Sequence, residues 1–303
     1  MKNSTVLVGG GVIATHYVKG FGNSSTLTLT ALVDTNPSCA ARELFSVPFF
    51  TELDDALKLK PEVAVLALPV AAHGRVAREL LSKGVDVITE KPMFGSLDEM
   101  DECLSFAKSR GKNLICMFHW KAADEVKFLK ANLSRYGKIK SISARVCDDY
   151  AATPDGSIRQ DRLGLMGAWI DSGINILSYF DEILDLSDAR LTSEEVIVDD
   201  KSGMPKYAKK VFLASGITAE ITVDWTKKSN KKTSVIECEG GTLFVDHTAQ
   251  TVSFDGKIVF DGAVPDRLSS HYENLFYSLL PDDTANIKST ILLHKLLFSG
   301  SAK

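Results

Sequence analysis

The 303-residue chain lacks the signatures of metalloproteins, membrane proteins and nucleic-acid-binding proteins. Its six histidines form no His-Glu-x-x-His motif, and no uninterrupted apolar run approaches the ~18 residues needed to span a bilayer. Lysine and arginine total 35 against 39 acidic residues, with no basic tract that would favour a phosphate backbone. We therefore expect no metal site, no membrane partner and no nucleic acid.

Cysteine is also scarce, and the cysteines are not arranged in closely spaced pairs. The five cysteines are odd in number and no two lie close together in the sequence, which argues against a disulfide framework or a zinc knuckle. The first residues contain no apolar segment typical of a signal peptide. These features favour a reducing compartment, and we expect a cytoplasmic protein.

What the chain does contain is an ordinary globular balance, with 45% hydrophobic and 24% charged residues. Its length indicates about two domains. Over residues 1–120, short β-branched runs alternate with helical stretches, which is typical of βαβ units around a doubly wound parallel sheet. The expected strands are Val6–Val8, Leu27–Val33, Val63–Leu68, Asp86–Thr89 and Asn113–Phe118.

Capping signals mark the expected helices between these strands. Asn36-Pro37 predicts a helix start, and Ser96 with Glu99 forms a capping box whose helix ends at Gly111. We therefore predict an N-terminal Rossmann domain over residues 1–120.

The pattern changes over residues 121–303, where helices over 124–133 and 166–184 flank a strand at Ile139–Cys147. Strands and hairpins follow, with turns at Gly240-Gly241 and Asp255-Gly256. The lysines at 227–228 and 231–232 predict a solvated hairpin tip, and a capping box from Ser270 to Glu273 opens the last helices. This half predicts an α+β domain with a largely antiparallel open sheet.

A dinucleotide fingerprint follows the first strand directly. Gly9, Gly11 and Ala14 occupy the G-x-G-x-x-G/A positions and open a helix, with Val12 and Ile13 between the last two. Gly9 would permit the tight turn and Gly11 the approach of a pyrophosphate to the helix N-terminus. The other interpretation is a glycine loop without a ligand.

An acidic residue ends the second strand at the expected distance. The carboxylate of Asp34 can accept hydrogen bonds from the adenosine ribose and would repel a 2′-phosphate, and the next basic residue is Arg42. The sequence therefore predicts NAD rather than NADP. The other interpretation is that Asp34 caps a helix.

Two further strings extend the pattern: Glu90-Lys91-Pro92 after the fifth strand, and Leu68-Pro69 followed by His73 after the fourth strand. With the glycine motif, they resemble the glucose–fructose oxidoreductase / inositol dehydrogenase (Gfo/Idh/MocA) family. The resemblance covers most of the chain and implies cofactor contacts from these residues.

Within the family, Asp171-Ser-Gly-Ile-Asn175 resembles the D-galactose and L-arabinose 1-dehydrogenase branch. His119 and Trp225 resemble that branch's sugar-contacting positions. Departures from it include Trp120-Lys121 after the histidine and the loop over residues 151–161.

The residue types suggest a division of roles in hydride transfer. Lys91, at a parallel strand end, can act as acid/base if its surroundings lower its pKa. Asp171 and Asn175, four apart on a helix, share one face and can orient a ligand, although an amide cannot be the base. His119 and Trp225 are candidates for substrate contact; the other interpretation makes both structural, and His73 is expected to be structural as well.

Three functions fit these observations: oxidation of an aldose at C1, oxidation of a secondary hydroxyl of a cyclitol or modified sugar, and a non-catalytic NAD-binding sensor. Lys91 with Asp171 argues against the sensor. Strands of the C-terminal half carry apolar residues on both faces, for example Ile217–Val223. Together with the resemblance, this predicts a homodimer or homotetramer through that sheet.

Overall fold

The computed structural model describes residues 1–300, which form two compact units. The first unit contains Met1–His119 together with Leu268–Thr290. The second contains Trp120–Arg267 and the residues that follow Ile291. Within the described residues, no helix is both long enough and apolar enough to cross a membrane.

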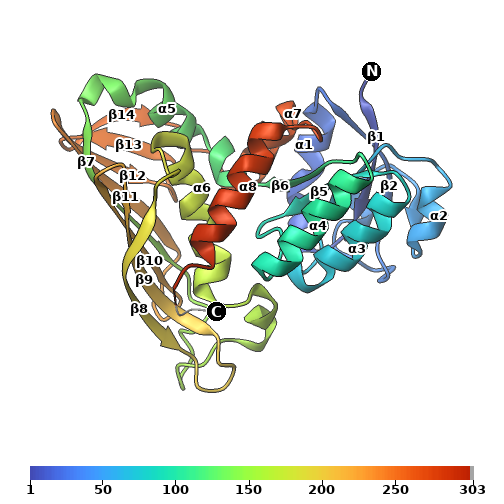
Figure 1. The fold of residues 1–303 in the computed structure, drawn as a ribbon, viewed down its shortest axis with the longest axis horizontal. Coiled ribbons are helices and arrows are strands. Elements are labelled where there is room, and N and C mark those ends of the chain that lie inside the picture. Colours follow the sequence, from blue (N-terminus) through green and yellow to red (C-terminus); the bar gives the residue numbers. More distant parts are fainter. Residues whose placement is uncertain (301–303) are drawn as a thin grey trace. The chain divides into compact units, whose positions relative to one another are not determined.

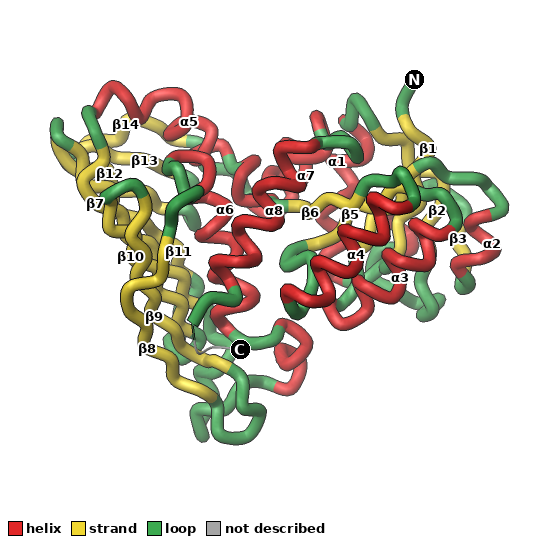
Figure 2. The backbone as a smooth tube through the Cα atoms, in the orientation of Figure 1, coloured by secondary structure: helices red, strands yellow, loops and turns green. Residues whose placement is uncertain are grey.

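The first unit is built on a six-stranded parallel sheet (Figures 1 and 2). The strand order is β3-β2-β1-β4-β5-β6. Successive strands from β1 to β3 are added toward one edge of the sheet, and those from β4 to β6 toward the other edge. Open α/β sheets bind their ligands at this reversal in strand order, which here lies between β1 and β4. The strands are β1 (Asn3–Val8), β2 (Leu27–Val33), β3 (Phe49–Phe50), β4 (Val63–Leu66), β5 (Asp86–Glu90) and β6 (Leu114–Met117).

Helices cover this sheet because its strands are apolar on both faces, as the near-complete burial of β4 shows. Helices α3 and α4 lie side by side (Figure 1), and α1 packs on α7, where Gly20 approaches Tyr272 and Phe276. The helices are η1 (Val12–Tyr17), α1 (Val18–Asn23), η2 (Arg42–Leu44), α2 (Leu53–Leu57), α3 (Val70–Ser82), α4 (Leu97–Ser109) and α7 (Arg267–Ser278).

The predicted α/β fold is confirmed, but two predicted helix starts are wrong. No helix begins at Asn36-Pro37, because the Asn36 side chain accepts a hydrogen bond from the Ser38 amide and closes a turn instead. The Ser270–Glu273 box does not open a helix either, since α7 already begins at Arg267. The Ser96 cap is confirmed: its hydroxyl accepts from the Glu99 amide at 3.2 Å.

The second unit is built on an eight-stranded sheet of order β14-β13-β12-β11-β7-β10-β9-β8. Neighbouring strands are antiparallel except β7 and β10, which are parallel. The strands are β7 (Ile139–Cys147), β8 (Arg190–Val198), β9 (Pro205–Ala214), β10 (Ile217–Asp224), β11 (Lys231–Cys238), β12 (Gly241–Asp246), β13 (Thr251–Phe254) and β14 (Lys257–Asp261).

Helices lie against one face of this sheet (Figure 2). The indole of Trp169 stacks on Phe212 of β9 with ring centroids 6.4 Å apart. The helices are η3 (His119–Ala122), α5 (Asp124–Asn132), η4 (Leu133–Tyr136), η5 (Gln160–Leu165), η6 (Trp169–Gly173), α6 (Ile174–Ile183) and α8 (Thr284–Leu297), which begins in the first unit.

The lysine cluster is solvated at Lys227, Lys228 and Lys231, as predicted, but it is not the tip of a hairpin. The flanking strands β10 and β11 are not neighbours, because β7 lies between them. Lys232 is buried, and its ammonium lies 2.9 Å from a carboxylate oxygen of Asp148. The clustering of lysines along the sequence did not predict this ion pair, because Asp148 lies far from Lys232 in the chain.

Candidate functional site

The glycine turn has the conformation that a close approach of backbone requires. Gly9 has φ +99°, and a Cβ there would lie 2.4 Å from the carbonyl oxygen of Ala67. Gly11 has ordinary extended dihedrals, and a Cβ there would meet nothing within 4 Å. Gly9 is therefore needed by the fold itself, whereas the open space above Gly11 is available to a ligand.

Asp34 is tied to this turn. Its Oδ2 accepts the amide N–H of Gly10 at 2.6 Å, and its Oδ1 accepts that of Asn36 at 2.8 Å. The half-buried carboxylate is thereby fixed at the end of β2, beside the glycines. This fixed position is the one that recognition of a ribose diol requires.

A cavity of about 380 Å³ lies next to Asp34 within the first unit. Four carboxylates and one guanidinium line it, together with Gly9 and Leu68, so its field is predominantly negative. The charged lining residues are Asp34, Glu52, Asp54, Glu79 and Arg75. A neutral adenosine fits this lining better than one carrying a 2′-phosphate.

Other predicted cofactor residues lie around the same turn. Val12 is 73% exposed at the start of η1, whereas Ile13 packs against the apolar core. Pro69 precedes α3, on which His73 is buried. The two ring nitrogens of His73 lie 3.0 and 2.9 Å from the carbonyl oxygens of Met93 and Leu68. These contacts fit the expected structural role of His73.

Glu90 and Lys91 end β5. The Glu90 carboxyl is 6% exposed, and its Oε2 accepts the Lys91 amide N–H at 3.0 Å. Its Oε1 accepts the hydroxyls of Tyr17 and Tyr272. The sequence did not predict these tyrosines, because they lie 73 and 182 residues from Glu90.

His119 ends the first unit and is 6% exposed. Its imidazole stacks on the Tyr272 ring with centroids 5.2 Å apart, and its Nδ1 lies 3.3 Å from that of His271. Helix α7 therefore supports both the carboxylate at the end of β5 and the imidazole after β6. His271 was not predicted either.

In the second unit, Asp171 and Asn175 lie on one continuous helix that is π-helical over Trp169–Gly173. The Asn175 amide donates to the Asp171 carbonyl oxygen at 3.3 Å, and the Asn175 Oδ1 is buried without a hydrogen-bond partner. Burial, with the charges of Asp148 and Asp171, raises the pKa of Tyr150 to about 12. The helix thus carries a carboxylate and an amide four residues apart, and both are groups that form hydrogen bonds with hydroxyls.

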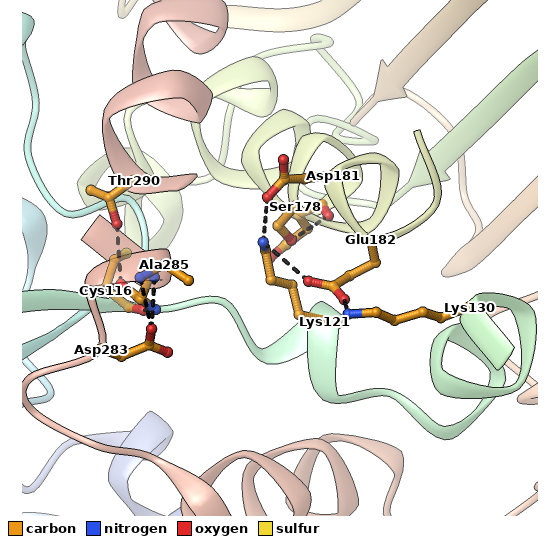
Figure 3. A network of polar contacts seen from close by, with 11 residues as sticks. Cys116, Lys121, Lys130, Ser178, Asp181, Glu182, Asp283, Ala285 and Thr290 are labelled. Atoms are coloured by element: carbon orange, nitrogen blue, oxygen red, sulfur yellow. Dashed lines mark hydrogen bonds and ion pairs between the residues drawn. The ribbon is translucent and has the colours of Figure 1, made fainter. Parts of the chain in front are cut away.

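Trp225 is fully buried, and the edge of Tyr150 meets it with ring centroids 5.1 Å apart. Full burial favours core packing of the indole over stacking on a sugar. Elsewhere in the second unit, Lys121 turns its ammonium toward the carboxylates of Asp181 and Glu182, and Glu182 also binds Lys130 (Figure 3). This network fixes η3 to α6 within the second unit.

A hydrogen-bonded triad is buried in the same unit. The Ser234 hydroxyl lies 2.8 Å from His247 Nε2, and His247 Nδ1 lies 2.9 Å from Glu125 Oε1. All three side chains are about 1% exposed. No substrate reaches such a hydroxyl, so the triad is structural rather than hydrolytic. Within residues 1–300, no cluster of three or more His, Cys, Asp or Glu could hold a metal ion.

A strand, a glycine turn and a helix N-terminus form the usual binding site for a dinucleotide, and the residues fit one, because the space above Gly11 is open. The protein is an NAD(P)-dependent dehydrogenase. Residues 4–118 match the family model described as "Oxidoreductase family, NAD-binding Rossmann fold", so this segment is similar to the NAD-binding domain of the Gfo/Idh/MocA family. No curated protein sequence matches the chain significantly.

Solved structures share the fold over almost the whole chain. A 3-ketoreductase from Actinomadura kijaniata, in complex with NADP and TDP-benzene, has a TM-score of 0.80 at 16% identity, over 98% of this chain and 96% of its own. A D-galactose-1-dehydrogenase from Rhizobium etli has a TM-score of 0.76 at 19% identity, over 98% and 93%.

An oxidoreductase from Agrobacterium radiobacter, in complex with NAD+, L-tartaric acid and magnesium, has a TM-score of 0.76 at 14% identity, over 98% and 94%. The similarity of these structures establishes the fold. Because the sequence identities are low, it does not fix the cofactor or the substrate.

Proposed function

We propose that the protein transfers hydride between the C1 carbinol of an aldose and the nicotinamide of NAD. The observation that carries the choice of NAD is the acidic cavity beside Asp34, where a 2′-phosphate would meet several carboxylates. The observation that supports the sugar class is the Asp171–Asn175 helix, which offers hydrogen-bonding groups for hydroxyls. The likeness in fold to a D-galactose-1-dehydrogenase also supports it.

The residues divide the chemical work as follows. The bound nicotinamide supplies the hydride acceptor. Lys91 takes the proton from the C1 hydroxyl as charge develops on its oxygen, and returns it in the reverse direction. Asp171 and Asn175 orient the sugar hydroxyls, while Asn175, which does not titrate, leaves the proton transfer to Lys91. His119 is proposed as a further sugar contact.

The cofactor is proposed to contact Gly9, Gly11, Val12, Ile13 and Asp34 at one end, and Leu68, Pro69, His73, Glu90 and Lys91 at the other. Residues 1–120 would bind NAD, and residues 121–303 would bind substrate and form a homodimer or homotetramer through the sheet. The five cysteines are free and buried, which supports our expectation of a cytoplasmic location.

The test is a panel of free aldoses and cyclitols incubated with NAD and, separately, NADP, with absorbance of the reduced cofactor as the readout. Activity on an aldose with NAD is the expected result. The Lys91→Ala variant should lose turnover while its affinity for NAD stays nearly unchanged, because Lys91 is one of many proposed cofactor contacts. Lys108→Ala, on the exposed side of α4, should behave like the parent.

Turnover only on cyclitols would replace the substrate class. Binding of NAD without turnover of any member would favour a sensor. Retention of most activity by Lys91→Ala would remove the lysine from its role as base.

A further inference from the structure

The carboxyl group of Glu90 is an unusual feature of the first unit, because three donors converge on it in a buried position. Tyr17 and Tyr272 both donate to Oε1, the latter at 2.5 Å, and the Lys91 amide donates to Oε2 at 3.0 Å. A carboxylate, which only accepts hydrogen bonds, suits three donors better than a carboxylic acid does.

The two tyrosines are placed to act only as donors. Both are fully buried, with ring centroids 4.7 Å apart. Burial, followed by the negative charge of Glu90, raises the pKa of each phenol well above its ordinary value. The hydroxyls therefore keep their protons at any physiological pH.

Within residues 1–300, the groups that contact the Glu90 carboxylate are these three donors, and none of the three is positively charged. Buried charges in proteins are normally paired, because removing an ion from water is costly. A buried carboxylate held by donors alone is thus prepared for a positive charge that a ligand brings.

The position of Glu90 in the sheet indicates which ligand group that is. The glycines and Asp34 follow β1 and β2, on one side of the reversal in strand order. Glu90 ends β5, on the other side of it. A dinucleotide bound across this reversal with its adenosine half near Asp34 would place its nicotinamide half toward β4 and β5.

We propose that Tyr17 and Tyr272 are positioning residues that hold Glu90 as a carboxylate toward the nicotinamide half, so that the site favours the oxidised cofactor over the reduced one. The oxidised ring carries a positive charge and the reduced ring does not, and only the former gains from a nearby anion. Tyr17 also ends η1, the helix that follows the glycines, so cofactor binding and the carboxylate share one support. This inference rests on the proposed cofactor site.

The test compares the dissociation constants of NAD+ and NADH for the parent and for Glu90→Gln, Tyr17→Phe and Tyr272→Phe, measured by titration calorimetry. Tyr277→Phe is the matched control, because Tyr277 lies on the same helix α7 but is 63% exposed. Glu90→Gln should raise the ratio of the NAD+ constant to the NADH constant by about tenfold, and each tyrosine variant should raise it by a smaller factor.

A defect that is merely structural would weaken both forms of the cofactor equally and leave the ratio unchanged. An unchanged ratio in the two tyrosine variants, with thermal unfolding showing that they are folded, would overturn the proposal even if Glu90→Gln failed to fold. A parent protein that binds neither form would overturn the cofactor site itself and this inference with it.

Discussion

Alanine substitutions at Gly9 and Gly11 should have opposite effects on stability, and the substitution at Gly11 should weaken cofactor binding. At Gly9, an alanine would have to adopt φ +99° and place its Cβ 2.4 Å from the Ala67 carbonyl oxygen and 2.8 Å from the carbonyl carbon. The unfavourable dihedral costs about 1–3 kcal/mol, and the steric overlap costs about 1–3 kcal/mol more. Gly9→Ala should therefore lose about 2–6 kcal/mol of stability.

At Gly11, the backbone has φ −67° and ψ −173°, which alanine adopts without strain, and the new Cβ meets no protein atom within 4 Å. The loss of chain entropy in the unfolded state should stabilise this variant by about 0.4–1 kcal/mol. The same Cβ would occupy the space through which a pyrophosphate approaches the backbone, so NAD affinity should fall about tenfold or more.

The assay is urea unfolding followed by tryptophan fluorescence, together with calorimetric titration of NAD into each folded variant. We expect a stable Gly11→Ala variant that binds NAD poorly and a destabilised Gly9→Ala variant. A Gly11→Ala variant with the NAD affinity of the parent would refute the proposed path of the pyrophosphate. A Gly9→Ala variant as stable as the parent would refute the argument from close packing.

Three further predictions concern charge and assembly. Tyr17 and Tyr272 have pKa values raised above 10.0 in the folded state. Their contribution to the free energy of unfolding is therefore fully present below about pH 10 and falls as the pH rises further, at about 1.4 kcal/mol per pH unit for each tyrosine. Unfolding measured at stepped pH should show a shallower fall in Tyr17→Phe than in the parent. The parent should bind NAD at least about tenfold more tightly than NADP in titrations. Asp34→Asn keeps the acceptor oxygen but removes the charge, so it should reduce this preference for NAD. Equal affinities for NAD and NADP in the parent would contradict the role of Asp34. Light scattering at micromolar concentration should give a multiple of the 33.0 kDa chain mass, whereas a monomer would exclude assembly through the sheet.

The outward face of that sheet is more polar than the sequence suggested. Lys209 and Glu220 form an ion pair at 2.9 Å, and Arg145 and Asp224 form another at 3.0 Å, while Phe244 is 40% exposed. Alternation in single strands did not reveal these pairs, because each joins residues on neighbouring strands. The proposed interface would thus combine charged and apolar contacts.

The parts of the site that sequence could predict are those set by local chain geometry. The strand, the glycines and the following helix lie within residues 3–17, and the carboxylate of Asp34 follows one strand later. Even here the local prediction was incomplete, because the segment after Asp34 forms turns and a short 3-10 helix rather than the predicted longer helix. The amide of Ala41 donates to the Gly10 carbonyl oxygen at 2.9 Å and fixes that segment against the glycine turn.

The parts that sequence could not predict depend on contacts between distant segments. Tyr272 reaches Glu90 across 182 residues, and Asn286 exchanges hydrogen bonds with the backbone of Cys116 at the edge of the sheet. A tyrosine in an amphipathic helix is normally assigned to the apolar core, and Tyr272 does lie there. Only the structure shows that its hydroxyl also meets a carboxylate.

The two carboxylates at strand ends illustrate what burial adds to a motif. Asp34 is half-buried and held by backbone amides, and we propose that it accepts hydrogen bonds from hydroxyl groups and distinguishes cofactors by the charge of their ribose. Glu90 is buried and held by phenols, and we propose that it acts on the cofactor through its charge. In the sequence, both are acidic residues at the ends of predicted parallel strands, and nothing there distinguishes them. Their different partners are the reason that we assign cofactor selection to Asp34 and preference for the oxidised ring to Glu90.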